Sequence, residues 1–126
     1  MINAIFPTGM ARFDIIPEMA ADAILKKFLD TTEPYHHLVR EIRLFGSRAR
    51  GDERPDSDYD ILILVHKKDR QMIDAFYDGV MNCLLEFGKL ISLKIYTLEQ
   101  WNYLCSLQTP FSQEVMKEGI LLGQGR

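Results

Sequence analysis

The chain has little of what marks several protein classes. It contains two cysteines, which lie in separate apolar helical patterns, so we expect free thiols in a reducing compartment and no zinc site. No apolar run is long enough to cross a bilayer. The first residues, MINAIFPTGMARF, lack the basic segment and continuous apolar stretch of a secretion signal. These absences predict a cytoplasmic protein that does not enter the membrane.

An excess of positive charge is also absent. Lys and Arg number 15 against 18 Asp and Glu, which gives a net charge of -3 and a pI near 5.6. Binding to nucleic acid depends on clustered Lys and Arg that neutralise phosphates, so we do not expect a nucleic-acid partner. The chain length suits one domain with one core. We predict an N-terminal arm over residues 1–17 and a single domain over residues 18–126.

Helical and strand patterns alternate along the chain. Apolar spacing and stop signals predict helices over 17–30 and 68–87, and two more that begin at the capping residues Thr97 and Thr109. A short helix over 35–40 and a helical turn over 47–50 are also expected. Alternating or continuous apolar residues predict strands over 41–45, 58–65 and 89–96. The apolar run Ile61–Val65 indicates a strand buried on both faces inside a sheet.

Two aspartates stand at the entrance of that apolar strand. Side chains two residues apart on a strand project the same way, so Asp58 and Asp60 share one patch. Like charges at that spacing repel unless a cation lies between them. A few hard oxygen ligands that leave positions for water and phosphate oxygens suit Mg²⁺. The pair therefore predicts a metal that holds a polyphosphate, although a polar strand entrance is the structural alternative.

The preceding turn, Gly46-Ser47, supplies groups that suit an anion. Gly46 has no Cβ, so a ligand can approach its backbone closely. The amides that open a helical turn at Ser47 and Arg48 point outward as donors, and the Ser47 hydroxyl adds another. Arg48 and Arg50 can neutralise further phosphate charge, and we favour Arg48. Arginines beside a loop are more often solvated, and a plain strand-ending turn is the other interpretation of Gly46-Ser47.

The segment LFGSRARGDERPDSDYDILILV, residues 44–65, resembles the minimal nucleotidyltransferases of the DNA polymerase β-like nucleotidyltransferase superfamily. Gly46-Ser47, ten further residues and then Asp58-Tyr59-Asp60 match the motif of that family. The resemblance implies an α+β fold of one domain, with a mixed central sheet flanked by helices. It implies that Gly46 and Ser47 grip a nucleoside triphosphate such as ATP. It also implies that Asp58 and Asp60 are catalytic ligands of Mg²⁺, with pyrophosphate as the leaving group.

The chain departs from the family at a third carboxylate. Aligning KLISLKIYTLEQW by its strand places that acid at Ser92, which is a poor metal ligand. Lys94 lies two residues on, on the same face of the strand, and is a candidate for binding phosphate. The expected two-ion Mg²⁺ site is therefore incomplete, and the metal that activates the acceptor is affected more than nucleotide binding.

Two functions remain open from the sequence. The first is transfer of AMP from ATP to a protein or small acceptor, as the antitoxin of a pair with a HEPN-domain protein, a partnership that the resemblance implies. The second is a catalytically impaired module that retains nucleotide binding or only the fold, because Ser92 replaces the third acid, and that neutralises a partner by contact. The N-terminal segment, with Ile2, Ile5, Phe6 and Phe13, is either an arm for a partner or homo-oligomer, or an extra edge strand.

Overall fold

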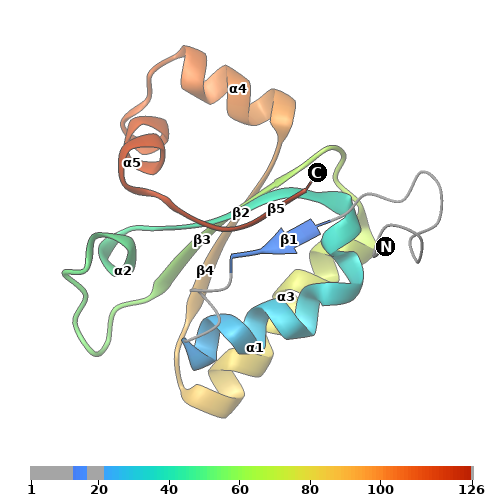
Figure 1. Ribbon diagram of the computed structural model, residues 1–126, viewed down its shortest axis with the longest axis vertical. Coiled ribbons are helices and arrows are strands. Elements are labelled where there is room, and N and C mark those ends of the chain that lie inside the picture. Colours follow the sequence, from blue (N-terminus) through green and yellow to red (C-terminus); the bar gives the residue numbers. More distant parts are fainter. Residues whose placement is uncertain (1–12, 17–21, 126) are drawn as a thin grey trace.

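The computed structural model describes residues 13–16 and 22–125. Its sheet has five strands in the order β1-β5-β2-β3-β4 (Figure 1). The pair β3 and β4 is parallel, and the other neighbouring pairs are antiparallel. The strands are β1 Phe13–Ile15, β2 Val39–Phe45, β3 Tyr59–Val65, β4 Ile91–Thr97 and β5 Ile120–Gly125.

The last three helices follow the predicted start and stop signals, whereas the first helix extends to Thr32 and the short helix predicted over 35–40 is a 3-10 helix over Glu33–Leu38. The long helix α3 ends at Gly88, whose φ of 66° is a left-handed conformation that favours glycine. Thr97 and Gln100 form the predicted capping box at the start of α4. The helices are α1 Ala23–Thr32, α2 Ser47–Arg50, α3 Arg70–Phe87, α4 Leu98–Ser106 and α5 Pro110–Glu118, and a 3-10 helix, η3, covers Glu33–Leu38.

Strand β3 contributes to two cores. Its residues Ile61, Ile63 and Val65 face α1 and α3, while Leu62 and Leu64 face α4 and α5. All five are buried, and β3 pairs with β2 on one side and β4 on the other, which confirms the predicted interior strand. The connection from β3 through α3 to β4 is the usual route between parallel neighbours.

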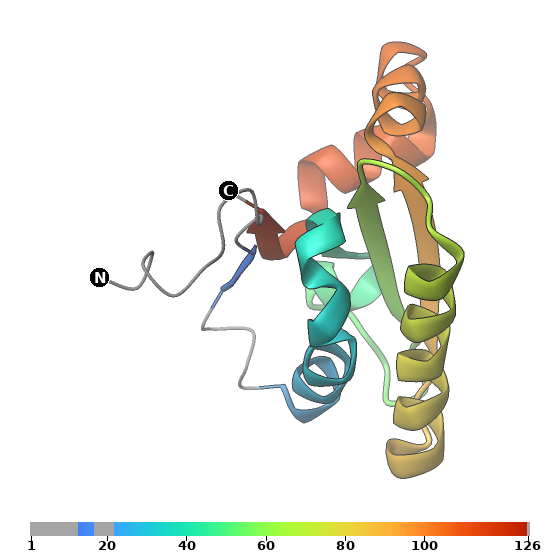
Figure 2. The same ribbon diagram turned by 90° about the vertical axis from the view of Figure 1, so that its right-hand side faces the viewer.

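The two cores differ in size. On the first face, α1 and α3 lie side by side along the sheet (Figure 2), and Phe28 of α1 contacts Phe76 of α3. On the second face, Phe111 of α5 lies against Phe45 and Trp101. Helices α4 and α5 gather at one end of the molecule (Figure 1). The predicted α+β fold, a mixed sheet flanked by helices, is confirmed.

Several elements differ from the sequence predictions. The segment Ile120–Gly125 was not predicted as a strand but forms β5, between β1 and β2. Of the two interpretations of the N-terminal segment, residues 13–15 form the edge strand β1. Ile2, Ile5, Phe6 and the boundary at residues 17 and 18 lie outside the described residues, so the arm stays a prediction. Among the described residues, no helix is long and apolar enough to span a membrane.

Candidate functional site

Gly46 lies where β2 ends and contacts the strand that follows. Its φ of 77° and ψ of -159° form a backbone conformation that is almost restricted to glycine. A Cβ placed on Gly46 would overlap the carboxylate of Asp60. Phe45, the residue before it, pairs with Asp60 across the two strands. The glycine turn and the aspartate strand are therefore in contact, and a side chain at position 46 would displace the carboxylate.

The predicted helical turn after Gly46 is α2. The amides of Ala49 and Arg50 both donate to the carbonyl oxygen of Gly46 at 3.1 Å. Gly51 ends the turn with a φ of 81°. The amides of Ser47 and Arg48 come first in the turn, and such amides have no acceptor within their own helix. The helical turn lies where the sequence predicted it, while the outward direction of its first amides and the ligand they bind stay predictions.

The two aspartates occupy different surroundings. Asp58 is exposed and immediately precedes β3, whereas Asp60 is half-buried within the strand. Because side chains alternate along a strand, Asp60 lies on the same face as Leu62 and Leu64, toward α4 and α5. Burial raises the pKa of Asp60, and the charges of Asp58 and Glu114 raise it further. A bound cation would remove this penalty on the charged form.

The loop that carries Asp58 is held by contacts that the sequence did not reveal. Arg48 donates from Nε and Nη2 to the carbonyl oxygen of Ser57, at 3.2 and 3.0 Å. Its guanidinium lies 4.1 Å from the centroid of the Tyr59 ring. The Tyr59 hydroxyl donates to Asp22 Oδ2 at 2.9 Å, and Asp22 also caps α1. Arg48 therefore positions the loop, and its predicted contact with nucleotide remains a prediction.

This network had one partial signal in the sequence. The position of Tyr59 between two aspartates implies that its ring faces the opposite side of the strand, and the ring is indeed buried. Burial, followed by the hydrogen bond to Asp22, raises the pKa of Tyr59 to about 12. The partner Asp22 lies 37 residues away along the chain. Local pattern carries no information on a contact at that separation.

Arg50 ties the glycine turn to the far end of the chain. Its Nη1 lies 3.2 Å from Glu114 Oε1 and 3.4 Å from Glu118 Oε2, both on α5. Its Nε lies 3.3 Å from Asp52 Oδ2. These side chains are partly exposed, so each pair alone contributes little stability. Together they place α5 beside α2, which brings Glu114 close enough to affect Asp60.

The parallel pairing of β3 with β4 shows where Ser92, the departure from the family pattern, lies relative to the aspartates. Asp60 pairs with Ser92, and Leu62 pairs with Lys94. Ser92 is thus the β4 residue directly beside Asp60, and Lys94 lies on the same face one step further along. Lys94 is exposed, and its charge lowers the pKa of Asp60 against the dominant effect of burial. The structure therefore brings Asp60, Ser92 and Lys94 together on one face, next to Gly46.

The donor set fits one magnesium ion better than two. Within residues 13–16 and 22–125, no three His, Cys, Asp or Glu side chains are grouped so that they could hold a metal. Mg²⁺ commonly binds through one or two carboxylates and completes its shell with water and phosphate oxygens. Asp58 and Asp60 suit that role, and a bound cation would offset the burial that raises the pKa of Asp60. On β4, the residue beside Asp60 is Ser92, so that strand offers no third carboxylate for a second ion.

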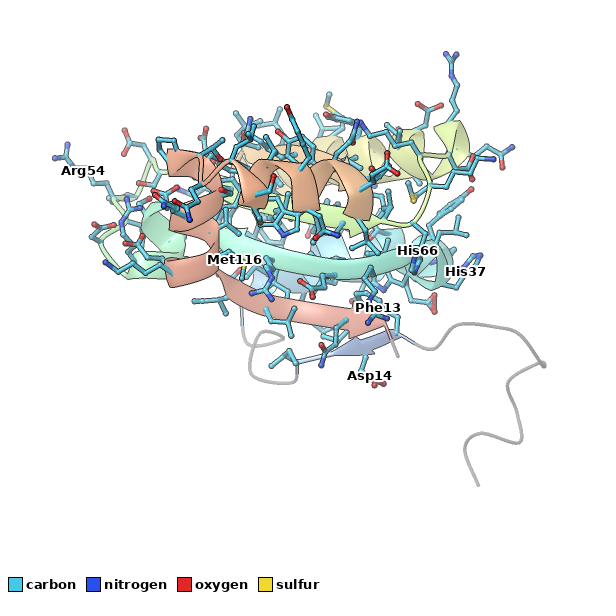
Figure 3. The ribbon with its side chains drawn as sticks, turned by 90° about the horizontal axis from the view of Figure 1, so that it is seen from above. Phe13, Asp14, His37, Arg54, His66 and Met116 are labelled. Carbon is cyan, nitrogen blue, oxygen red and sulfur yellow. The ribbon has the colours of Figure 1, made fainter. Side chains whose placement is uncertain are left out.

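Two hollows lie at opposite ends of β3. One, of about 340 Å³, is lined by Asp58 and the end of α3, with Leu84 and Leu90. The other, of about 470 Å³, is lined by His37, His66 and the start of α3. Figure 3 shows His37 and His66 together at one end and Arg54, in the loop before Asp58, at the other. The larger hollow is therefore remote from the aspartates.

Three comparisons with known proteins identify the family and the fold of the chain. Residues 23–118 match the family model described as the nucleotidyltransferase domain, and this range includes Gly46, both aspartates, Ser92 and Lys94. A protein of Methanocaldococcus jannaschii, provisionally named a protein adenylyltransferase, is 30% identical over 105 residues, which cover 82% of this chain and 99% of the relative. A solved toxin-antitoxin structure with AMP-PNP has a TM-score of 0.53 at 22% identity, covers 77% of this chain and 70% of its own, and shows a shared fold.

Proposed function

Because the chain belongs to the nucleotidyltransferase domain family, we propose that it transfers AMP from ATP to a hydroxyl group of a protein. The observation that carries the proposal is the contact between Gly46 and Asp60. It joins a turn with outward amides to a carboxylate of raised pKa at one point. A protein acceptor is supported by the name of the archaeal relative, which covers most of this chain.

Each site residue has a role in this proposal. The amides of Ser47 and Arg48 and the hydroxyl of Ser47 bind the triphosphate beside Gly46. Lys94, on the face of Asp60, binds a phosphate oxygen. Asp58 and Asp60 hold one Mg²⁺. When bound, this ion neutralises phosphate charge and draws electrons from the α-phosphorus.

The transfer itself breaks one bond and forms another. The acceptor oxygen forms a bond to the α-phosphorus, and the bond from that phosphorus to the β-phosphate oxygen breaks. Pyrophosphate leaves with the electron pair, and the acceptor proton passes to solvent. Because Ser92 offers no carboxylate at the place of a third acid, the acceptor loses its proton without a nearby base from β4. The chain's residues therefore bind and orient the nucleotide more than they activate the acceptor.

The test is a transfer assay with a matched control. The protein is incubated with α-labelled ATP, Mg²⁺ and the protein encoded next to it, and label on either protein is measured. We expect transfer by the wild type and none by Asp58→Asn combined with Asp60→Asn. Glu53→Gln, which changes an exposed acid in the same loop, serves as the control and retains transfer. Equal labelling by the double variant would contradict the proposed site.

A second function is favoured by Ser92. Ser92 in place of an acid on β4 beside Asp60 suits a chain that binds a partner, for example a HEPN-domain protein, or forms a homo-oligomer, and acts by contact. In that case the wild type transfers no label while it still neutralises the neighbouring protein. Neutralisation that survives Asp58→Asn with Asp60→Asn favours contact, and neutralisation lost together with transfer favours the enzyme.

A further inference from the structure

Helix α3 carries an apolar stripe on the side that faces away from the sheet. Its inner side is buried against α1 and the sheet, as Met72 and Phe76 show. At helical spacing on the outer side, Tyr77, Met81 and Leu85 are 52%, 51% and 78% exposed. Figure 2 shows α3 lying along the outside of the molecule. Large apolar side chains gathered on one exposed surface mark a place where another molecule binds.

The apolar stripe ends at the candidate active site. Leu84 and Leu90, both partly exposed, line the hollow of about 340 Å³ that also contains Asp58. The backbone of Tyr59 donates to the carbonyl oxygen of Leu90 at 3.0 Å, which fixes the two segments together. Apolar surface and carboxylate thus share one hollow. A molecule bound along the stripe therefore extends to the hollow that contains Asp58.

The charges beside the stripe are mainly negative. Asp74 and Asp78 flank it on α3, and Asp56 and Asp58 lie at its end in the hollow. Lys89 is the one positive side chain among the residues that line this hollow, and its Nζ donates to the carbonyl oxygen of Pro55. Among the described residues, Asp78 forms no salt bridge, and Asp74 meets only Arg70, at 4.0 Å, with both side chains well exposed. A second copy of this chain would bring the same acids to the contact. Positive charge on the partner complements them.

We propose that this stripe is the docking surface for an amphipathic helix of the acceptor protein, with apolar residues on one face and Lys or Arg beside them. The proposal rests on the proposed function, since it supplies the protein acceptor of that reaction. From Tyr77 to Leu85 the stripe spans nine residues and rises by about 12 Å, which two to three turns of a partner helix cover. Docking there presents a hydroxyl near the end of the partner helix to Asp58.

The test uses a defined peptide and no nucleotide. A fluorescent helical peptide with a leucine face flanked by lysines is titrated with the protein, and anisotropy gives its affinity. A matched peptide has glutamate in place of each lysine. We expect the lysine peptide to bind roughly tenfold or more tightly than its glutamate counterpart.

Two double variants locate the peptide on the surface. Met81→Ser with Leu85→Ser removes apolar area from the stripe and should weaken binding roughly tenfold or more. Tyr103→Ser with Met116→Ser removes two residues of similar exposure, 64% and 61%, on α4 and α5 and should leave the affinity within about twofold. All changed side chains are exposed, so these variants should fold.

Three outcomes would overturn the docking surface. The first is equal affinity for both peptides, and the second is an affinity that Met81→Ser with Leu85→Ser leaves unchanged. The third is self-association of the wild-type protein that this double variant abolishes, because the stripe would then bind a second copy of the chain. The two proposals can fail separately. Peptide binding without AMP transfer refutes the enzyme alone, and transfer that is unaffected by the stripe variant refutes the surface alone.

Discussion

The two faces of the sheet are built from alternate residues of the same strands, yet they differ in composition. The face toward α1 and α3 is closed by apolar side chains. The face toward α4 and α5 combines a smaller apolar core with charged and polar residues. The latter face presents Glu41 and Arg43 of β2, Asp60 of β3, and Ser92 and Lys94 of β4.

The difference shows how one strand serves stability and chemistry at once. In β3, Ile61 and Ile63 are fully buried in the first core, while Asp60 opens toward the second face. Some charged residues on the face toward α4 and α5 are paired with one another, since Arg43 Nε donates to Glu41 Oε1 at 2.7 Å. Stability should therefore respond mainly to changes on the first face, and ligand binding mainly to changes on the second.

The largest expected effect is on stability and follows removal of an aromatic side chain from the face toward α1 and α3. Phe76→Ala leaves a cavity between α1, α3 and the sheet, and we expect it to lower the free energy of unfolding by about 3–5 kcal/mol. Lys94→Ala, on the other face, should change it by less than about 0.5 kcal/mol. Urea denaturation of both variants gives the comparison. Similar losses would show that the two faces do not divide these roles.

A somewhat smaller loss is expected where the turn meets the second face. Gly46→Ala forces a side chain into a backbone conformation that favours glycine and displaces the Asp60 carboxylate. We expect roughly 2–3 kcal/mol of destabilisation, together with weaker ATP binding. Gly51→Ala is the control, because Gly51 also has a positive φ but a Cβ there would meet nothing within 4 Å. If Gly51→Ala weakened ATP binding equally, strain alone would account for the effect.

The pH dependence of stability tests the buried histidine, His36, at the edge of the face toward α1 and α3. Burial lowers the pKa of His36 from 6.5 to about 4, partly opposed by the charge of Asp30. The unfolded chain then binds the proton more readily, so His36 contributes full stability above pH 6.5 and loses it as the pH falls toward 4. Between pH 7 and pH 5 the loss should be about 2 kcal/mol.

The control variant for this effect is His36→Gln, which keeps a polar group beside Thr32. In the wild type, Thr32 Oγ1 lies 2.9 Å from His36 Nε2. Denaturation of wild type and variant at both pH values isolates the contribution of the histidine. A smaller pH dependence is expected for the variant. The same slope in both proteins would mean that His36 titrates normally in the folded state.

The smallest expected effect is that of a substitution at Ser92, and it changes the activation free energy of AMP transfer. Ser92→Asp places a third carboxylate beside Asp60, and we expect AMP transfer to rise roughly tenfold with little change in stability. Ser92→Asn has a similar size without the charge and should give no increase. A decrease with aspartate would indicate that added negative charge near Asp60 opposes nucleotide binding.

Much of the molecule could be predicted from its sequence because the signals are local. The motif spacing and the continuous apolar run of β3 identified the family and the interior strand. Caps at Thr97 and Gly88 set helix ends. Strand β5 was missed because Gly123 and Gly125 weaken its pattern, and a Cβ on Gly123 would overlap the Phe13 ring of β1.

What the sequence could not supply depends on contacts between distant segments. The burial of His36 follows from Thr32 on the same turn and from Phe13, whose ring centroid lies 4.8 Å away. The link from Arg48 through Tyr59 to Asp22 requires α1 to lie against β3. No pattern within either segment specifies the contact between α1 and β3, because tertiary packing determines which segments meet.

The tie between Arg50 and α5 has a spectroscopic consequence. Glu114 and Glu118 share α5 with Phe111, whose ring centroid lies 6.0 Å from that of Trp101. The chain has a single tryptophan, so its indole emission comes from one known position. We expect a ligand that shifts the turn at Ser47 to move Arg50 and, through it, the ring beside the indole. Titration with nucleotide should then change the indole emission without an added label.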